Sequence, residues 1–181
     1  MKLPVLRLAS GVLFFFVASK SLEAQDYSEK HEPSMTKHRQ IGHPDFLSPH
    51  ARPILLHDGN VFVVNTREDT LDVIQVGNFG IVARIHVGVD PVGLALKPNG
   101  KEIWVSNHIS DSVSVIDTDP TSPFYLNVLA TIQDIDPRTK ATRFDEPVGI
   151  AFASNEKAYV ALSAENQIAV VNVHTRQVEK K

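Results

Sequence analysis

The feature that most constrains this chain is a unit that occurs three times after residue 50. Three matched runs begin with an aromatic residue: Phe-Val-Val-Asn at 62–65, Trp-Val-Ser-Asn at 104–107 and Tyr-Val-Ala-Leu at 159–162. Trp104 follows Phe62 by 42 residues, and Tyr159 follows Trp104 by 55. A repeat of this length folds as one supersecondary unit that buries its apolar surface against its neighbours, so the repeat decides the architecture.

Each unit contains four short runs rich in β-branched residues. In the second unit these runs lie at 91–95, 104–107, 113–117 and 129–132. Turn-forming residues separate the runs, as in Asp58-Gly59 of the first unit and Asn99-Gly100 of the second. Short β-branched runs predict strands, and a recurring four-stranded unit of about 40–50 residues is typical of a β-propeller blade. We therefore predict an all-β fold, a β-propeller made of four-stranded antiparallel blades.

The number of units predicts an incomplete propeller, with about three blades present. We place the partial propeller at 51–181 and its blades at about 51–88, 89–134 and 135–181. A closed propeller needs four to eight blades, and three would leave two open sheet edges. The expected partners are therefore the remaining blades of the same propeller in cis, in a longer protein of which this is the N-terminal part, or self-association of several copies.

The second unit carries a recognisable repeat motif. It has a Pro-Val-Gly start at 91–93, an Asn-Gly-Lys turn at 99–101, an aromatic-Val-x-Asn strand at 104–107 and a Val-Ser-Val-Ile-Asp strand at 113–117. This pattern resembles the YVTN-type β-propeller repeat of exported bacterial proteins, and the resemblance covers 51–181. It implies the propeller fold but no single activity, because such propellers serve in surface proteins, lactonase-like enzymes and redox proteins.

The N-terminal segment predicts export. Lys2 and Arg7 precede a short apolar stretch at 8–18, which as a helix would span only about half of a bilayer core. We interpret residues 1–24 as a signal peptide, cleaved after Ala24 or after Ser21, which leaves no transmembrane anchor. Residues 25–50 are polar and read as a flexible linker. The expected location is the periplasm, the cell surface or the extracellular space.

Composition excludes several classes of chemistry. The chain has no cysteine, which excludes disulfides, thiolate metal sites and CxxCH haem attachment within these residues. Its net charge of −3 and lack of a basic block argue against nucleic-acid binding. Five histidines from His31 to His57 are spaced mostly by seven residues, but intervening prolines forbid a helix that would align them. We expect no cofactor or metal in this chain, and haem only in a downstream part.

The candidate binding face lies where the loops after the second and fourth strands of each blade meet. The third unit is extended there by residues 134–145, and added loop length on a rigid scaffold is a common place for binding surfaces. The candidate residues for a protein or small-molecule ligand on this face are Arg52, His86, Asp90, His108, Arg143, Phe144, Asp145 and Glu146.

Other repeated residues are predicted to be structural. We expect Phe62, Trp104 and Tyr159 to pack between neighbouring blades. Asp117 and the matching Asn172 should end their strands in Asx-type turns, and Asn65 and Asn107 should tie down strand ends through backbone hydrogen bonds. The acidic run at 117–119 lacks the glycine and glutamate of a calcium loop.

Three functions remain open from the sequence. The first is an exported propeller module that binds a partner or presents a scaffold, with no catalysis in this chain. It follows from a strong repeat without a recognisable nucleophile or phosphate-binding motif. The second is the N-terminal part of a larger periplasmic redox or lactonase-like enzyme, and the third is a cell-surface or adhesion protein. Fold analogy alone does not choose between them.

Overall fold

The computed structural model describes residues 50–181 as twelve strands in three sheets. Blade 1 comprises β1 (Ile54–His57), β2 (Asn60–Asn65), β3 (Thr70–Gln75) and β4 (Ile81–His86). Blade 2 comprises β5 (Pro91–Leu96), β6 (Glu102–Asn107), β7 (Ser112–Asp117) and β8 (Val128–Ile132). Blade 3 comprises β9 (Pro147–Phe152), β10 (Lys157–Leu162), β11 (Gln167–Asn172) and β12 (Gln177–Lys180). The predicted signal peptide and nearly all of the predicted linker lie outside the described residues.

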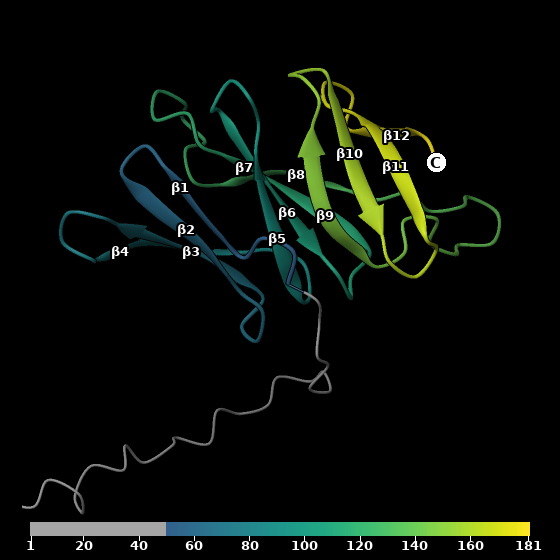
Figure 1. The fold of residues 1–181 in the computed structure, drawn as a ribbon, viewed down its shortest axis with the longest axis horizontal. Coiled ribbons are helices and arrows are strands. Elements are labelled where there is room, and N and C mark those ends of the chain that lie inside the picture. Colours follow the sequence, from purple (N-terminus) through teal and green to yellow (C-terminus); the bar gives the residue numbers. More distant parts are fainter. Residues whose placement is uncertain (1–49) are drawn as a thin grey trace, which may run out of the picture. The chain divides into compact units, whose positions relative to one another are not determined.

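Each sheet is a four-stranded antiparallel meander in sequence order, which confirms the predicted fold class. Blade 2 lies between the other two, and the first strands of adjacent blades are neighbours (Figure 1). The chain passes from one blade to the next by connecting an outermost strand to the next innermost one. No helix among residues 50–181 is long and apolar enough to cross a membrane.

The hairpins follow the turn residues of the sequence. Asp58 and Gly59 are the two residues between the paired ends of β1 and β2, and both have positive φ, at 45° and 71°. Positive φ at both central positions is typical of the type I′ turns that suit two-residue hairpins. Gly100, in the longer turn between β5 and β6, also has a positive φ of 74°.

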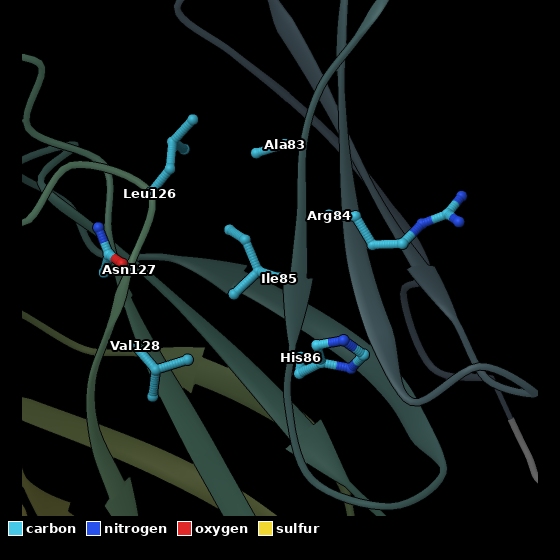
Figure 2. A pocket seen from close by; sticks show the side chains of 7 residues that line it. All are labelled: Ala83, Arg84, Ile85, His86, Leu126, Asn127 and Val128. Atoms are coloured by element: carbon cyan, nitrogen blue, oxygen red, sulfur yellow. The ribbon is translucent and has the colours of Figure 1, made fainter.

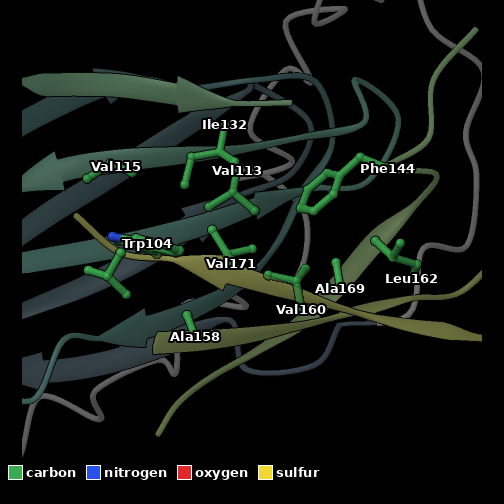
Figure 3. Close-up of a cluster of buried hydrophobic side chains, with 11 residues drawn as sticks. Trp104, Val113, Val115, Ile132, Phe144, Ala158, Val160, Leu162, Ala169 and Val171 are labelled. Carbon is green, nitrogen blue, oxygen red and sulfur yellow. The ribbon is translucent and has the colours of Figure 1, made fainter. Parts of the chain in front are cut away.

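The core consists of two apolar clusters, one at each junction between blades. The first joins blade 1 to blade 2 and includes Phe62, Leu71, Ile103 and Ile116. The second joins blade 2 to blade 3 (Figure 3) and is formed by Trp104, Val113, Val115, Ile132, Phe144, Ala158, Val160, Leu162, Ala169, Val171 and Val173. Apolar burial between sheets, not within a single sheet, therefore holds the blades together.

The burial pattern of the strands distinguishes the middle blade from the end blades. Every residue of β7 and all but the first of β6 are buried, so blade 2 is covered on both faces. In β10 exposed and buried residues alternate strictly, which is the pattern of a strand covered on one face only. Phe62 and Trp104 are fully buried as predicted, but Tyr159 is 40 % exposed. The expectation for Tyr159 was wrong because its side of blade 3 has no neighbouring blade within the described residues.

The predicted Asx turns are present. Asp117 Oδ1 accepts a hydrogen bond from the amide of Asp119, and Asn172 Oδ1 accepts from the amides of His174 and Thr175. Asn107 was expected to hydrogen-bond to the backbone, and this expectation was wrong. Its side-chain amide donates to the hydroxyls of Ser112 and Ser114 across the hairpin, at 3.0 Å each, and not to the backbone.

Candidate functional site

One edge of the blades carries the loops that contain most of the predicted site residues. Each blade contributes the loop between its second and third strands, and the connections into blades 2 and 3 end at the same edge. The segments concerned are 66–69, 87–90, 108–111, 133–146 and 163–166. We call this edge the loop face.

Three side chains converge on the loop face around a buried imidazole. His108, directly after β6, is only 8 % exposed. Its Nδ1 lies 3.5 Å from Asp90 Oδ2, and its Nε2 lies 3.6 Å from Glu146 Oε2 and 3.4 Å from Ser163 Oγ. We call Asp90, His108, Glu146 and Ser163 the His108 cluster. Asp90 and Glu146 were predicted, whereas Ser163 was missed although it occupies the same repeat position as His108.

The His108 cluster joins blade 2 to blade 3. The Ser163 hydroxyl contacts the Glu146 carbonyl oxygen at 3.1 Å and Glu146 Oε2 at 3.0 Å. The backbone beside it is fixed by a repeated contact, in which Asp111 Oδ1 accepts from the amide of Glu146 at 3.0 Å. Asp69 Oδ1 accepts from the amide of Asp90 in the same way, at 2.9 Å. Each aspartate thus holds the residue directly before the first strand of the next blade.

The order Ser163, His108, Asp90 matches the order of groups in a nucleophilic triad. In a catalytic triad the two links are typically hydrogen bonds of about 2.6–3.2 Å, and they are often longer without substrate. Here the two links are 3.4 and 3.5 Å, His108 Nδ1 makes no hydrogen bond, and the Ser163 hydroxyl is engaged by Glu146. In this arrangement Ser163 and His108 form a contact between blade 3 and blade 2.

The loop face is electronegative beside the His108 cluster. Burial raises the pKa of the Asp145 carboxyl, and the neighbouring carboxylates of Asp111, Glu146 and Glu165 raise it further. Carboxylates gathered in this way favour a cationic group over an anionic one at the same place. Within residues 50–181, however, no three histidine, aspartate or glutamate side chains are placed to hold a metal ion.

The extra loop at 134–145 is held in a defined shape by its own side chains. Arg143 donates to Asp134 Oδ1 through Nη2 at 2.6 Å and Nε at 3.1 Å, and its Nη1 lies 3.8 Å from Asp136 Oδ2. Asp136 Oδ1 also accepts from the amides of Thr139 and Arg138, and these bonds lower the Asp136 pKa. The tip of the loop therefore presents Arg138 and Lys140 to solvent on a fixed frame.

Phe144 lies in the core and not on the binding face where it was predicted. Its side chain is fully buried, and Figure 3 shows its ring among the aliphatic side chains of the blade 2–blade 3 cluster. The loop thus ends in an apolar anchor, which the mixed polar composition of 134–145 did not reveal. Phe144 fixes the loop and is not available to a ligand on the surface.

The structure places two predicted residues away from the His108 cluster. His86 lines an outer cleft of about 420 Å³ between β4 and residues 126–128, where Ile85 faces the cleft and Arg84 points away (Figure 2). Arg84 instead pairs with Asp72 on the other side of the sheet, at 2.8 Å. Arg52 lines a separate inner groove with Leu56, Leu96 and Phe152. The eight predicted residues therefore do not form one site.

Comparison with solved structures supports the propeller fold. The chain is similar to Kuenenia stuttgartiensis hydrazine synthase, with 23 % identity and a TM-score of 0.58 over 78 % of this chain and 38 % of that chain. It is also similar to U3-55K (16 % identity, TM-score 0.55, 74 % of this chain and 40 % of that one) and to the WD40 β-propeller domain of Doa1 (13 %, 0.50, 70 % and 37 %).

These similarities describe a shared fold. The chain spans about two fifths of the length of each of these structures. No family model matches the chain, so the resemblance to the YVTN-type repeat is not confirmed at the level of the family. No curated protein sequence matches it either.

Proposed function

We propose that this chain is an exported β-propeller module that binds a partner through its loop face and acts as a binding or scaffold domain, without catalysis in these residues. The observation that supports the proposal most is the loop at 134–145. Its backbone is fixed by the Arg143–Asp134 pair and by the buried Phe144, while its charged tip faces solvent. A rigid loop loses little conformational entropy on binding, which favours recognition.

The surroundings of the loop suggest the chemistry of the partner. The acidic residues beside Asp145 and the cationic tip at 138–140 lie on one loop face, so the surface carries both signs of charge. Such a surface suits a partner with complementary charges and makes association faster at low salt. We therefore expect a protein partner in preference to an apolar small molecule.

Site-specific photo-crosslinking tests the binding face. A photoreactive amino acid replaces Lys140 on the loop face or, as the matched control, Glu156 in the turn between β9 and β10 at the opposite edge. In cells that make the protein, the variant at 140 should give a discrete adduct with a second protein, and the variant at 156 should not. Equal adducts from both variants, or none from either, would overturn the proposal.

Export is tested separately on the mature N-terminus. The proposal expects the protein outside the cytoplasm, beginning at Gln25 or Leu22 after removal of the signal peptide. Intact mass and N-terminal sequence of the native protein measure this directly. Recovery of the protein from the cytoplasm with Met1 retained would contradict export while leaving the binding proposal open to the crosslinking test.

A second candidate is the N-terminal part of a larger redox enzyme. The likeness to hydrazine synthase, whose chain is more than twice as long as the matched part, is the observation that favours it. The test is the natural coding sequence beyond Lys181. A CxxCH motif there would favour this candidate, whereas its absence would remove the haem-dependent version.

A further inference from the structure

The chain enters blade 1 from the loop face. Leu55 of blade 1 and Ala95 of blade 2 each pair with the aromatic position of their blade. Five residues earlier stand His50 and Asp90, so His50 has the repeat position that Asp90 holds on the loop face. Its Nε2 lies 2.9 Å from Thr66 Oγ1, in the loop between β2 and β3. The residues before His50 therefore leave the blades at the loop face, at a point that we call the exit.

The exit lies close to the corner where blade 2 meets blade 3. The Ala51 amide donates to the Val92 carbonyl oxygen at 3.1 Å, and the Ala51 Cβ is 4.0 Å from the position that a Cβ on Gly149 would take. Glu146 precedes Gly149 by three residues, which span about 10 Å in a strand. The exit is therefore roughly 10–15 Å from Glu146.

The carboxylates of this corner are short of cations. Asp111, Glu146 and Glu165 all raise the pKa of the Asp145 carboxyl. Glu165 is paired with Lys181 at 2.9 Å, but no lysine or arginine of residues 50–181 forms an ion pair with the other three acids. We call Asp111, Asp145, Glu146 and Glu165 the acidic corner.

A buried imidazole nitrogen in the same place also lacks a partner. His108 is 8 % exposed, and its Nδ1 makes no hydrogen bond. Nδ1 lies 3.5 Å from Asp90 Oδ2, while Nε2 lies 3.6 Å from Glu146 Oε2. A neutral imidazole donates through one nitrogen only, so with the proton on Nε2 the Nδ1 acceptor faces a carboxylate, which is a second acceptor. An added positive charge stabilises such a group of acceptors.

The sequence before the exit contains one stretch of purely basic charge. Lys37 and Arg39 are the only charged residues of 33–44, and we call 33–44 the basic stretch. Arg39 precedes His50 by eleven residues, which reach at most about 36–40 Å when fully extended. That reach exceeds the distance from the exit to the acidic corner. A short tether of this kind also keeps the local concentration of the attached group in the millimolar range.

We propose that the basic stretch binds the acidic corner of the same chain, with Lys37 and Arg39 against the carboxylates of Asp145 and Glu146. The contact supplies the positive charge that the corner lacks. It also leaves the cationic tip at 138–140 as the part of the loop face that is open to a partner. This last consequence rests on the function proposed above, whereas the contact within the chain does not.

The acids at the opposite edge offer no comparable target. Asp119 is paired with Lys101 at 2.7 Å, and Glu102 is paired with Lys97 at 3.0 Å. Such pairs already neutralise the charges that would attract a basic segment. The acidic corner is therefore both nearer to the exit and richer in carboxylates without a cationic partner.

Paramagnetic relaxation in nuclear magnetic resonance spectra of the native protein tests the contact. The chain has no cysteine, so Thr36→Cys provides a single site for a nitroxide label. The label should remove most of the amide signal intensity at 109–111 and 163–166, and should leave the signals at 97–101 and 153–157 on the opposite edge unchanged. Lys37→Glu combined with Arg39→Glu should restore the lost intensity, because it turns attraction into repulsion.

Two matched variants and salt make the test specific. Lys30→Glu makes the same change of charge outside the basic stretch and should leave the broadening in place. Asp145→Asn removes one carboxylate of the acidic corner and should weaken the broadening. Its fold should stay intact, because the substitution removes a charge that burial disfavours. Salt at 1 M should also restore the signals, since it screens charges beyond about 3 Å.

Three outcomes overturn the inference. Broadening confined to 66–69 beside the exit, and unchanged by Lys37→Glu with Arg39→Glu, means that the basic stretch does not bind the acidic corner. Equal broadening at both edges means that the contact has no defined place. Broadening in an unlabelled chain by a separate labelled chain means that the contact forms between molecules. None of these outcomes decides partner binding at the tip of the loop, which is tested separately at position 140.

Discussion

Truncation of Trp104 tests the packing of blade 2 on blade 3. The side chain is fully buried, with the Phe152 ring at 4.9 Å and Val113, Val115 and Ala158 in the same cluster. Trp104→Ala removes the largest side chain of that cluster and leaves a cavity between two sheets that are each hydrogen-bonded internally. Core substitutions of this kind destabilise proteins by about 3–5 kcal/mol.

The polar end of the indole contributes part of that loss. Nε1 donates to the carboxylate oxygen Glu102 Oε2 at 3.0 Å, and a hydrogen bond to a charged group is worth about 1.5–3 kcal/mol. Removal of the indole leaves the Glu102 carboxylate paired with Lys97 at 3.0 Å, so no buried charge is left without a partner. The expected total is therefore about 4 kcal/mol, a large part of the 5–15 kcal/mol of a typical domain.

The assay is urea unfolding followed by far-ultraviolet circular dichroism, because Trp104 is the only tryptophan and its removal abolishes the fluorescence probe. The control is Phe124→Ala, which truncates an aromatic side chain that is 60 % exposed and should change the unfolding free energy by less than about 0.5 kcal/mol. A loss below about 1 kcal/mol for Trp104→Ala, or equal losses for both variants, would refute the packing described here.

Three further predictions concern single residues. Gly93→Ala would place a Cβ 2.5 Å from the Val148 carbonyl oxygen of the next blade and should cost about 1–3 kcal/mol in urea unfolding, whereas Gly77→Ala, with open space around it, should not. Asp145→Asn should raise the unfolding free energy at pH 7 by less than about 1 kcal/mol. Folding raises the pKa of the Asp145 carboxyl, so its ionised form destabilises the folded protein, and the substitution removes that charge. That gain should disappear as the pH falls below 3.8, where the carboxyl is protonated in both states, and a gain that persists there would contradict the cause. Arg143→Gln should release the loop from Asp134 and speed limited proteolysis at Lys140, and unchanged cleavage would mean that the ion pair does not hold the loop.

The fold was predictable because the repeat determines it at several levels. Turn residues such as Asp58 and Gly59 fix the hairpins, and β-branched runs fix the strands. The phase of the repeat also predicted that Phe62 and Trp104 would be buried. It misplaced Tyr159, since burial of that position depends on a neighbouring blade and not on the residue itself.

The site was predictable only in part. The repeat predicted which loops share an edge, and so brought Asp90, His108 and Glu146 together. It could not predict that Phe144 turns inward, because a single aromatic in an irregular loop has no periodicity to indicate its direction. Arg52 lies in the inner groove because it stands at the start of the first strand of blade 1. The first strands of the three blades lie next to one another there.

The central claim is that consecutive repeats are blades packed face to face. The most direct test is a nuclear Overhauser measurement from the single indole ring of Trp104 in the isotope-labelled chain. We expect cross-peaks to the ring protons of Phe152 and to the Ala158 methyl group, both from the next repeat. Cross-peaks only to residues of its own sheet, with an indole that exchanges rapidly with solvent, would contradict the packed-blade architecture.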